Sequence, residues 1–172
     1  MSDAGFRFCP RCATPLVWRE EGGRDRSACP GCGWVHWDNP VPVVAAVVDY
    51  QGRVLLARNA AWPPKIFGLV TGFLERGEAP AAAVAREVKE ETDLDARQCA
   101  LIGVYEFAQR NELIIAYHVV ADGTIRLSDE LAEYRLIEPA RLRPWPFGTG
   151  LALADWMRSR GLAVEFLNTV PG

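Results

Sequence analysis

The fold of this chain is decided by a stretch in two parts, Gly72-Phe73-Leu74-Glu75-Arg76-Gly77-Glu78 and Arg86-Glu87-Val88-Lys89-Glu90-Glu91-Thr92-Asp93-Leu94. The first part is bounded by glycines and predicts a loop. Pro80 suits the first position of a helix, where its missing N–H is not needed. The apolar spacing then predicts a helix over residues 81–92, whose buried face consists of Ala81, Val84, Ala85 and Val88.

Three carboxylates share the opposite side of this helix, because Glu87, Glu90 and Glu91 are spaced i, i+3 and i+4. Like charges at this spacing cost a helix about 0.2–0.5 kcal/mol per pair, and no Lys or Arg lies one turn away to pair with Glu87 or Glu91. A hard divalent cation would relieve the repulsion, and Mg²⁺ takes carboxylates together with substrate phosphates. Taken alone, the pattern also fits a solvated acidic face. Glu78 and Arg86 predict an ion pair that holds the loop against the helix.

The stretch resembles the Nudix box, G-x5-E-x7-R-E-U-x-E-E-x-G-U, in which U is an aliphatic residue. The matching positions are Gly72, Glu78, Arg86, Glu87, Val88, Glu90, Glu91 and Leu94. One position departs from the pattern, because Asp93 replaces the last glycine. That glycine would end the helix in a left-handed conformation, which Asp tolerates better than most residues. We therefore expect a small loss of stability and no loss of metal binding.

The composition describes a chain of one domain with room for a small extra module. It has 172 residues, a hydrophobic content of 49% and a formal net charge of −3. The negative charge argues against general affinity for nucleic acid. No apolar run is long enough to span a bilayer, and residues 1–8 do not resemble a signal peptide. We expect a cytoplasmic protein without a membrane partner.

Four of the five cysteines form a second pattern, Cys9-x2-Cys12 followed by Cys29-x2-Cys32. This spacing is typical of a tetrahedral zinc site with four thiolates, which leaves no open coordination position and is therefore structural. Disulfides are the alternative, and the lack of an export signal disfavours them. Ala13 occupies a knuckle position where glycine is common, so we expect slight strain there. Cys99 remains as a small buried side chain rather than a nucleophile.

The zinc ribbon predicted over residues 1–38 has two candidate roles. Zinc ribbons often bind nucleic acid, and Trp18, Trp34 and Trp37 could stack on bases. However, residues 1–40 contain five basic and five acidic residues, and tracking a phosphate backbone requires a basic surface. We therefore favour a packing or dimer-forming role and expect a homodimer.

The main domain is predicted over residues 39–172. Apolar runs bounded by turn residues predict strands at 43–48, 53–58, 66–70, 101–107, 113–120, 134–137 and 164–167. A second helix is expected over 149–159, with Thr149 as its cap and Gly161 just beyond its end. Strands around one central helix, with another helix near the C-terminus, predict an α/β fold. The Nudix resemblance implies the same architecture, an α/β/α sandwich with a mixed sheet.

The resemblance implies hydrolysis of the P–O–P bond in a nucleoside diphosphate linked to another group, with Mg²⁺ or Mn²⁺ as the cofactor. The barrier would be lowered mainly by positioning of the attacking water and the substrate, and by metal ions that stabilise the charge developing on the phosphoryl oxygens. By the same resemblance, Glu87, Glu90 and Glu91 are metal ligands, and a backbone carbonyl near Gly72 contributes. Arg86 and Glu78 complete the site.

The identity of the general base stays open. Glu87 is one candidate, and in some relatives the base or a further ligand comes from a later loop. Glu130 and Glu133 lie in such a segment, and either could serve. A surface role is the alternative for Glu130, so Glu133 is the preferred candidate. Arg58, at the end of a strand, is a candidate for contact with a substrate phosphate. His36 and His118 are isolated and fit structural roles.

Two Nudix branches carry an N-terminal zinc ribbon, and they imply different substrates. The NADH pyrophosphatases have an S-Q-P-W-P-F segment soon after the box, which residues 104–110 do not match, although Pro144-Trp145-Pro146-Phe147 occurs much later. The short ADP-ribose/FAD pyrophosphatases share the order of segments seen here. We therefore predict ADP-ribose or FAD as substrate, giving AMP and a monophosphate, with NADH as the alternative. Trp145 and Phe147 fit either stacking on the substrate or a place in the core.

Two non-hydrolytic functions are weaker hypotheses. A regulatory protein that kept the scaffold without catalysis would be expected to lose glutamates from the box, and none of the three is missing. A nucleic-acid-binding module built on the ribbon is disfavoured by the neutral charge of residues 1–40. The sequence therefore favours an enzyme that acts on a small nucleotide.

Overall fold

The computed structural model describes residues 5–168 and divides at Pro40 into two compact units, Met1–Pro40 and Val41–Gly172. The predicted domains, 1–38 and 39–172, differ from these units by two residues at the boundary. Their outer ends, 1–4 and 169–172, lie outside the described residues. Each unit has its own core, so the local structure of each follows from its own residues.

The first unit is built on a hairpin and four cysteines. Strands β1 (Val17–Glu21) and β2 (Arg24–Ala28) pair antiparallel, with Val17 opposite Ala28. Gly22 and Gly23 make the turn between them in the left-handed region, at φ +61° and +78°. The buried apolar residues are only Cys9, Ala28 and Cys29 among the described part of this unit. A core of this size needs a metal or another cross-link to hold it.

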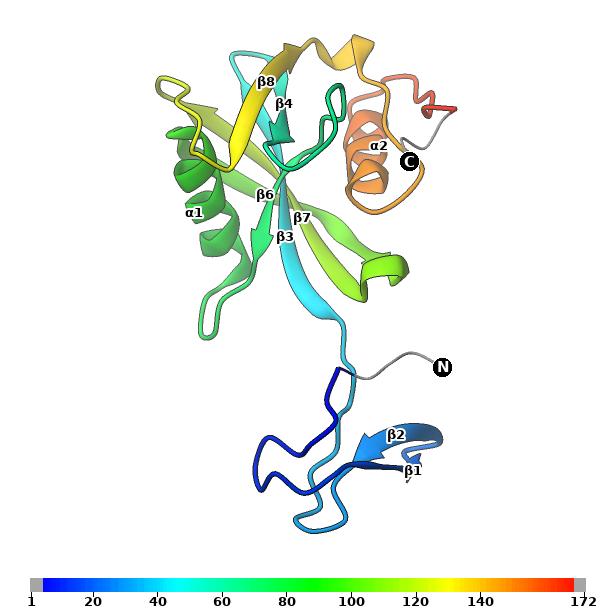
Figure 1. Ribbon diagram of the computed structural model, residues 1–172. Coiled ribbons are helices and arrows are strands. Elements are labelled where there is room, and N and C mark those ends of the chain that lie inside the picture. The colour runs from blue at the N-terminus through cyan, green and yellow to red at the C-terminus, as the bar shows by residue number, and fades with distance from the viewer. Residues whose placement is uncertain (1–4, 169–172) are drawn as a thin grey trace. The chain divides into compact units, whose positions relative to one another are not determined.

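The second unit consists of strands, two α-helices and two short 3₁₀ helices (Figure 1). The elements in chain order are β3 (Val41–Tyr50), β4 (Arg53–Asn59), β5 (Val70–Phe73), α1 (Pro80–Thr92), β6 (Asp95–Phe107), η1 (Ala108–Arg110), β7 (Glu112–Asp122), β8 (Leu131–Ile137), η2 (Pro139–Arg141) and α2 (Thr149–Ser159). Within residues 5–168, neither helix is long and apolar enough to cross a lipid bilayer.

The sheet of this unit is mixed and has β3 at its centre. The strand order is β6-β7-β3-β4-β8, and β5 also pairs with β3. The β3–β7 pair is parallel and the other pairs are antiparallel. Residues 43–48 of β3 are buried on both faces of the sheet. A continuous apolar run is what a strand covered on both faces requires, which explains the composition of this segment.

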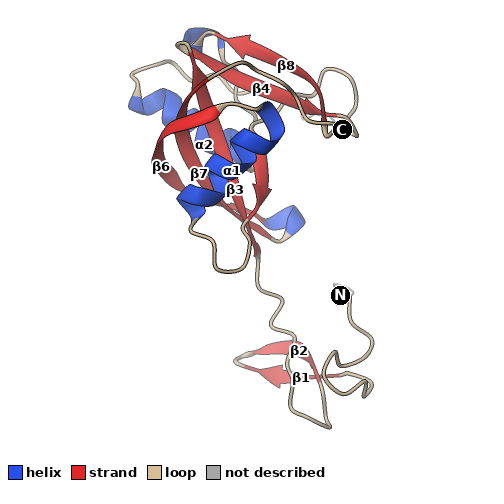
Figure 2. Cartoon of the chain, turned by 90° about the vertical axis from the view of Figure 1, so that its left-hand side faces the viewer, coloured by secondary structure: helices blue, strands red, loops and turns tan. Residues whose placement is uncertain are grey.

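Alternate residues of β3 belong to two separate cores. Val44, Ala46 and Val48 pack with Val84 and Val88 of α1, whereas the odd-numbered neighbours pack with α2, through Leu153, Trp156 and Met157. The two helices therefore cover opposite faces of the sheet, as Figure 2 shows from the side of α1. This arrangement confirms the predicted α/β/α sandwich with a mixed sheet.

Helix α1 begins at Pro80 and ends at Thr92, as predicted. Asp93 takes the left-handed conformation expected at the position of the missing glycine, with φ 58° and ψ 13°, and its N–H donates to the Lys89 carbonyl. The buried face differs from the prediction, because Ala81 is exposed and Ala83 and Thr92 are buried. Thr92 can be buried because its hydroxyl donates a hydrogen bond to the Val88 carbonyl.

Three predictions about local structure are wrong. Strand β5 begins at Val70 rather than Ile66, since Gly68 forms only an isolated bridge with Ala57. Residues 164–167 form no strand: the Leu167 N–H donates to the Pro144 carbonyl, and Val164 packs against the core beside α2. Thr149 is the first helical residue rather than the cap, because Gly148 precedes it with φ 50°.

Candidate metal and catalytic site

Arg86 lies at the centre of the stretch that decides the fold. Its guanidinium donates to both carboxylate oxygens of Glu78, at 2.9 and 3.0 Å, and to the Phe73 carbonyl at 3.2 Å. The predicted ion pair between loop and helix is therefore confirmed. The bidentate geometry fixes the glycine loop against α1, and hydrogen bonding to Arg86 lowers the pKa of Glu78.

The same guanidinium also neutralises part of the acidic face. Nη1 of Arg86 lies 2.7 Å from Oε1 of Glu87 and 2.9 Å from Oε2 of Glu90. The expectation that no basic residue pairs with Glu87 is thus wrong, because the side chain of the adjacent residue bends back to reach it. Glu90 remains 58% exposed, whereas Glu87 is 14% exposed. The two carboxylates therefore face different environments on one helix.

Glu87 lies directly against Gly72 at the end of β5. A Cβ built on Gly72 would lie 1.8 Å from the carboxylate carbon of Glu87. No side chain fits there unless the Glu87 carboxylate moves away, so glycine at this position is a steric requirement of the site. The glycine loop thus sets the position of a helix carboxylate as well as the path of the chain.

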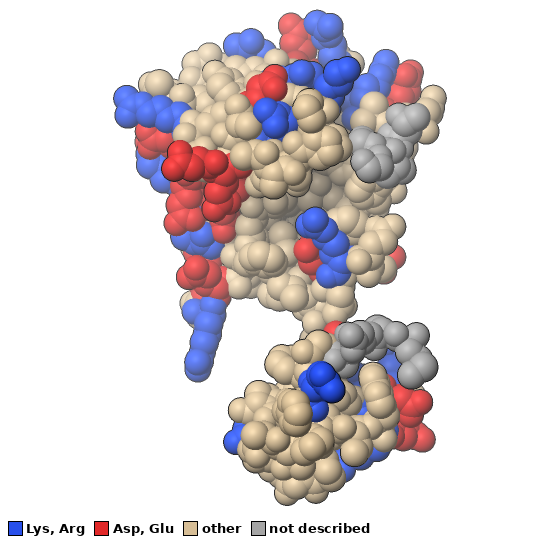
Figure 3. Space-filling model, viewed as in Figure 1, with Lys and Arg blue, Asp and Glu red and all other residues tan. Residues whose placement is uncertain are grey.

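Glu91 is the carboxylate left without a countercharge. No ion pair or hydrogen bond reaches its side chain from the described residues. Burial raises the pKa of Glu91 to about 8, and the charges of Glu87, Glu130 and Glu90 add to the effect. Burial also raises the pKa of Glu87, against the opposing influence of Arg86. In Figure 3, acidic side chains gather on the side of the larger unit where α1 lies.

Glu130 joins this group from a segment far along the chain. The N–H of Ser128 donates to the Glu91 carbonyl and that of Arg126 to the Thr92 carbonyl, at 3.0 and 2.9 Å, so the segment before β8 is tied to the end of α1. The charge of Glu130 raises the pKa of both Glu87 and Glu91. Glu130 itself is exposed, in agreement with the surface role predicted for it. Nothing local in the sequence reveals the backbone attachment that brings its segment to the end of α1.

Glu133 occupies a different environment. It lies opposite Arg58 in the β4–β8 register and pairs with it at 3.5 Å, and its other oxygen is 3.6 Å from Arg135. Their neighbours Ala57 and Tyr134 face α1, so Arg58 and Glu133 point away from it. The structure brings Gly72, Glu78, Arg86, Glu87, Glu90 and Glu91 together and does not bring Glu133 and Arg58 to them. This placement favours Glu130 over Glu133.

The four cysteines of the first unit converge on one point. Their sulfur atoms all lie within 4.8 Å of one another, with Cys9 and Cys32 at 3.5 Å and Cys12 and Cys29 at 3.4 Å. A disulfide needs about 2.05 Å, whereas four thiolates around zinc at about 2.3 Å lie roughly 3.8 Å apart. The geometry fits zinc. Among residues 5–168, no other group of three or more such ligands is gathered as tightly.

The two cysteine knuckles have matching backbone geometry. The N–H of Ala13 donates to the Cys9 carbonyl at 2.9 Å, and the N–H of Gly33 donates to the Cys29 carbonyl at 3.1 Å. Ala13 and Gly33 occupy equivalent left-handed positions, at φ 58° and 75°. The strain expected at Ala13 is therefore present, since a residue with a Cβ adopts this region at a cost of about 1 kcal/mol. Cys99 is half-buried on β6.

Other residues singled out in the sequence lie in packed positions. Phe147 stacks on Phe107 with ring centroids 5.9 Å apart, and Trp145 packs against the core beside α2. Both placements favour the core role over substrate stacking. His118 lies between Asp49, at 3.5 Å, and Arg160, at 3.2 Å.

Comparisons with known families match both units. The family model described as NUDIX domain matches residues 38–156, and the model described as Nudix N-terminal, a zinc ribbon, matches residues 7–38. Among solved structures, the NUDIX hydrolase of Nitrosomonas europaea superposes with a TM-score of 0.77 at 24% identity, covering 95% of this chain and 100% of that one. This likeness shows the fold.

Curated relatives carry the name NAD-capped RNA hydrolase NudC. The Mycobacterium tuberculosis protein is 32% identical over 114 residues, which are 66% of this chain and 36% of that protein. The Stutzerimonas stutzeri protein is 30% identical over 112 residues, 65% of this chain and 40% of that protein. The matched region is thus well under half of these relatives.

Proposed function

The chain belongs to the Nudix hydrolase family, and from this premise we propose that it is a divalent-metal-dependent pyrophosphohydrolase. Its substrate class is a nucleoside diphosphate linked to another group, cleaved at the P–O–P bond. The observation that carries the proposal is the carboxylate cluster of α1, in which the half-buried Glu91 has no countercharge and a pKa raised to about 8. Carboxylates arranged in this way are the oxygen ligands that Mg²⁺ or Mn²⁺ prefers.

The residues of the site divide into ligands and supports. Glu87, Glu90 and Glu91 would hold the metal, which when bound supplies positive charge to the phosphoryl oxygens. Arg86 keeps Glu87 and Glu90 oriented while Glu78 anchors the guanidinium to the loop. Gly72 leaves room for the Glu87 carboxylate against the backbone. Metal sites commonly need such outer residues, which hold the ligating carboxylates in the orientation that the metal requires.

We propose Glu130 as the carboxylate that accepts the proton of the attacking water. Its charge acts on both Glu87 and Glu91, so it lies in the same electrostatic environment as the ligands. Glu133 is the comparison residue, because its partners are Arg58 and Arg135.

For the substrate we propose an NAD-type dinucleotide, NADH first, in line with the name of the curated relatives. ADP-ribose or FAD is the second candidate, and one observation favours it. Residues 104–107, where the NADH pyrophosphatases would begin their S-Q-P-W-P-F segment, form the regular end of β6 and carry a different sequence. Trp145 and Phe147, which occur much later in the chain than that segment, pack in the core and do not take its place.

The test is hydrolysis of a substrate panel by the zinc-loaded chain with Mg²⁺ or Mn²⁺. NADH, NAD, ADP-ribose and FAD are each supplied, and phosphate is measured after a phosphatase step that acts on the products. Turnover of NADH above that of ADP-ribose and FAD is the expected result. Turnover of none of the four compounds contradicts the enzyme proposal, and turnover of FAD or ADP-ribose alone contradicts only the choice of substrate.

Glu130 is tested with a matched pair of variants. We expect Glu130→Gln to lower kcat by about 10²–10⁴-fold, the contribution typical of general base catalysis, and Glu133→Gln to lower it far less. A pH–rate profile separates the roles, since loss of a base also removes the acidic limb of the profile. Equal effects of the two substitutions would contradict the assignment.

A further inference from the structure

The sheet of the second unit has a long edge that no other strand covers. Strand β6 is the last strand on its side, because within residues 5–168 it pairs with β7 alone. It is 13 residues long, so a long row of backbone N–H and C=O groups on its outer side lacks strand partners. An exposed edge of this length is a template on which another strand can add, and natural proteins normally protect it.

The opposite edge of the same sheet shows such protection. Strand β8 is only 7 residues long and carries two charged side chains. In β6, residues 98–107 contain a single charged side chain, that of Glu106, and no proline. Leu101 and Val104 in this stretch are 59% and 55% exposed. Charge therefore protects β8 far more than β6, and β6 leaves apolar surface in water that a partner could cover.

Leu101 and Val104 lie on the same face of the sheet. They stand opposite Tyr117 and Ile115 of β7, which take part in the core between the sheet and α1. Directly opposed residues of an antiparallel pair point to the same side, so the two exposed side chains extend this core to the edge of the sheet. The apolar surface at the edge is thus continuous with the interior of the unit.

The spacing along β6 allows the strand to pair with a copy of itself. A twofold axis perpendicular to the sheet runs the two strands antiparallel and keeps each side chain on its own face. With the axis between Ile102 and Gly103, Leu101 of each copy lies opposite Val104 of the other. The four apolar side chains then form one cluster on the α1 face.

The β-bulges of β6 agree with this register. Its pairing with β7 shifts between Ala96 and Gln98 and again between Leu101 and Gly103. The first bulge lies outside residues 98–107, the stretch that the axis pairs with itself, and the second falls on the axis. A bulge discourages pairing because it bends away from a straight strand. Here both copies bend at the same point, so the bulge is no obstacle.

Charge does not oppose this pairing. Glu106, which is the charged residue of the paired stretch, lies opposite Cys99 of the other copy and far from its own symmetry mate. Beyond the stretch, Asp95 at the start and Arg110 at the end carry opposite charges, and antiparallel pairing sets the start of one strand beside the end of the other. Arg110 is 63% exposed, and its ion pair with Glu112 is long, at 3.8 Å.

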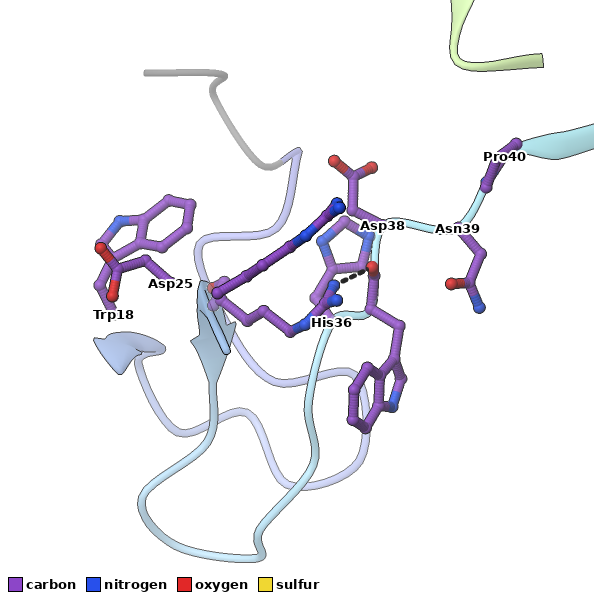
Figure 4. A pocket seen from close by; sticks show the side chains of 10 residues that line it. Trp18, Asp25, His36, Asp38, Asn39 and Pro40 are labelled. Carbon is purple, nitrogen blue, oxygen red and sulfur yellow. Dashed lines mark hydrogen bonds between the residues drawn. The ribbon is translucent and has the colours of Figure 1, made fainter. Parts of the chain in front are cut away.

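The first unit offers another candidate surface for a dimer, but its exposed indole rings do not form one patch. The β1–β2 register puts Trp18 on the face opposite Arg26, whose guanidinium lies 4.8 Å from the centroid of the Trp37 ring. The pocket near them is lined by charged side chains, among them Asp25 and Asp38 (Figure 4). An apolar surface that is continuous with a core favours β6 over this unit.

We propose that two copies of the chain pair along residues 98–107 of β6 about this twofold axis and join their sheets into one. Both α1 helices then lie on the same side of the joined sheet, because the axis leaves each face on its own side. The partner is a second copy because the register, the bulge and the end charges match the strand to itself. The inference does not depend on the hydrolytic function, since it uses no residue of that site.

Sedimentation velocity of the full zinc-loaded chain tests the proposal, and the parent chain is expected to sediment as a dimer. Leu101→Lys and Val104→Glu each bury a charge against an apolar side chain of the second copy, so each should raise the dissociation constant of the dimer at least about tenfold. Tyr134→Lys changes an exposed residue of the opposite edge, on β8. It is the matched control and should leave the dimer unchanged. Circular dichroism checks that each variant is folded.

Mixing the two β6 variants tests the register itself. In a mixed dimer the introduced lysine of one chain lies opposite the introduced carboxylate of the other, and the remaining pair of positions keeps Leu101 and Val104. The mixture should therefore form dimers under conditions in which each variant alone is monomeric. Hydrogen exchange tests the backbone pairing: amides of residues 98–107 should exchange more slowly as the parent chain is concentrated, and those of β8 should not.

The proposal is overturned if the parent chain stays monomeric at about 1 mM, or if both β6 variants dimerise as tightly as the parent. Trp18→Lys tests the first unit as the contact surface. Loss of the dimer with this substitution, and not with the two in β6, would place the contact in the first unit and overturn the proposal. A dimer that is lost in both β6 variants and does not return on mixing would refute the proposed register.

Discussion

The four cysteines of the first unit and the three glutamates of α1 are both sets of candidate metal ligands, and their arrangements differ. The cysteine sulfurs lie within 4.8 Å of one another with their backbone bonds in place. The glutamates are not gathered so tightly, and Arg86 draws Glu87 and Glu90 toward itself while Glu91 stays half-buried without a countercharge.

The difference follows from what each site has to do. Four thiolates complete a tetrahedron and leave no position for a substrate, so a preassembled arrangement serves stability. A catalytic site for a diphosphate must keep positions for substrate oxygens, and its ligands carry unrelieved charge until a cation arrives. We therefore expect hydrolysis to depend strongly on the glutamates and weakly on the cysteines, and the following predictions test that contrast in order of decreasing effect.

Glu91→Gln should have the largest effect. It keeps the shape of the side chain and removes the charge aimed at the metal, so we expect turnover to fall at least about 100-fold. Steady-state hydrolysis of the best panel substrate measures the effect. Glu106→Gln, an exposed residue of β6, is the control and should be close to the parent chain. Near-normal rates for Glu91→Gln would refute the metal assignment.

Gly72→Ala should have the second-largest effect on hydrolysis. We expect kcat to fall about 10-fold or more, because the new methyl group would occupy the space of the Glu87 carboxylate. The stability loss should be small, since the φ of Gly72 is not in the left-handed region. Gly77→Ala is the contrasting variant: Gly77 has φ 82° and open space around its Cα, so it should lose stability but retain more activity. The reverse pattern would show that the loop matters only for folding.

Removal of zinc should lower the rate of hydrolysis less than either substitution. Its main effect should be on the folding of the first unit. We expect a chelator to unfold residues up to about 40, because the apolar core there is too small to fold without the metal, and to leave part of the hydrolysis intact. Proteolysis and thermal scans measure the first effect, and the phosphate assay the second. Full thermal stability in the chelated chain would contradict structural zinc.

The stability of the zinc-loaded chain without Mg²⁺ should depend on pH with a definite sign. Glu91 has a folded-state pKa of about 8 against an ordinary value of 4.5, so the folded state holds the proton more tightly across that range. Stability should therefore fall as pH rises from about 5 to 8, and stabilisation by Mg²⁺ should grow over the same window.

Thermal unfolding with and without Mg²⁺ checks this, and Glu91→Gln should flatten the pH dependence. The carboxyl groups whose pKa is lowered, Glu78, Asp93 and Asp122, titrate below this window and do not obscure it. Burial lowers the pKa of His118, which makes stability rise with pH over part of the same window, so the comparison with Glu91→Gln isolates the carboxylate. A Tm of the parent chain that rises relative to that of Glu91→Gln between pH 5 and 8 would contradict a half-buried, unpaired Glu91.

The sequence by itself determined the family, the sandwich fold, the start and end of α1, the left-handed Asp93 and the cysteine pattern, because each depends on residues close in the chain whose spacing is fixed by helix or turn geometry. Only the tertiary structure decided that Glu130 rather than Glu133 lies near the trio, and that residues 164–167 form no strand. These depend on hydrogen bonds and packing between segments far apart in the chain, and local spacing does not encode which distant partners meet.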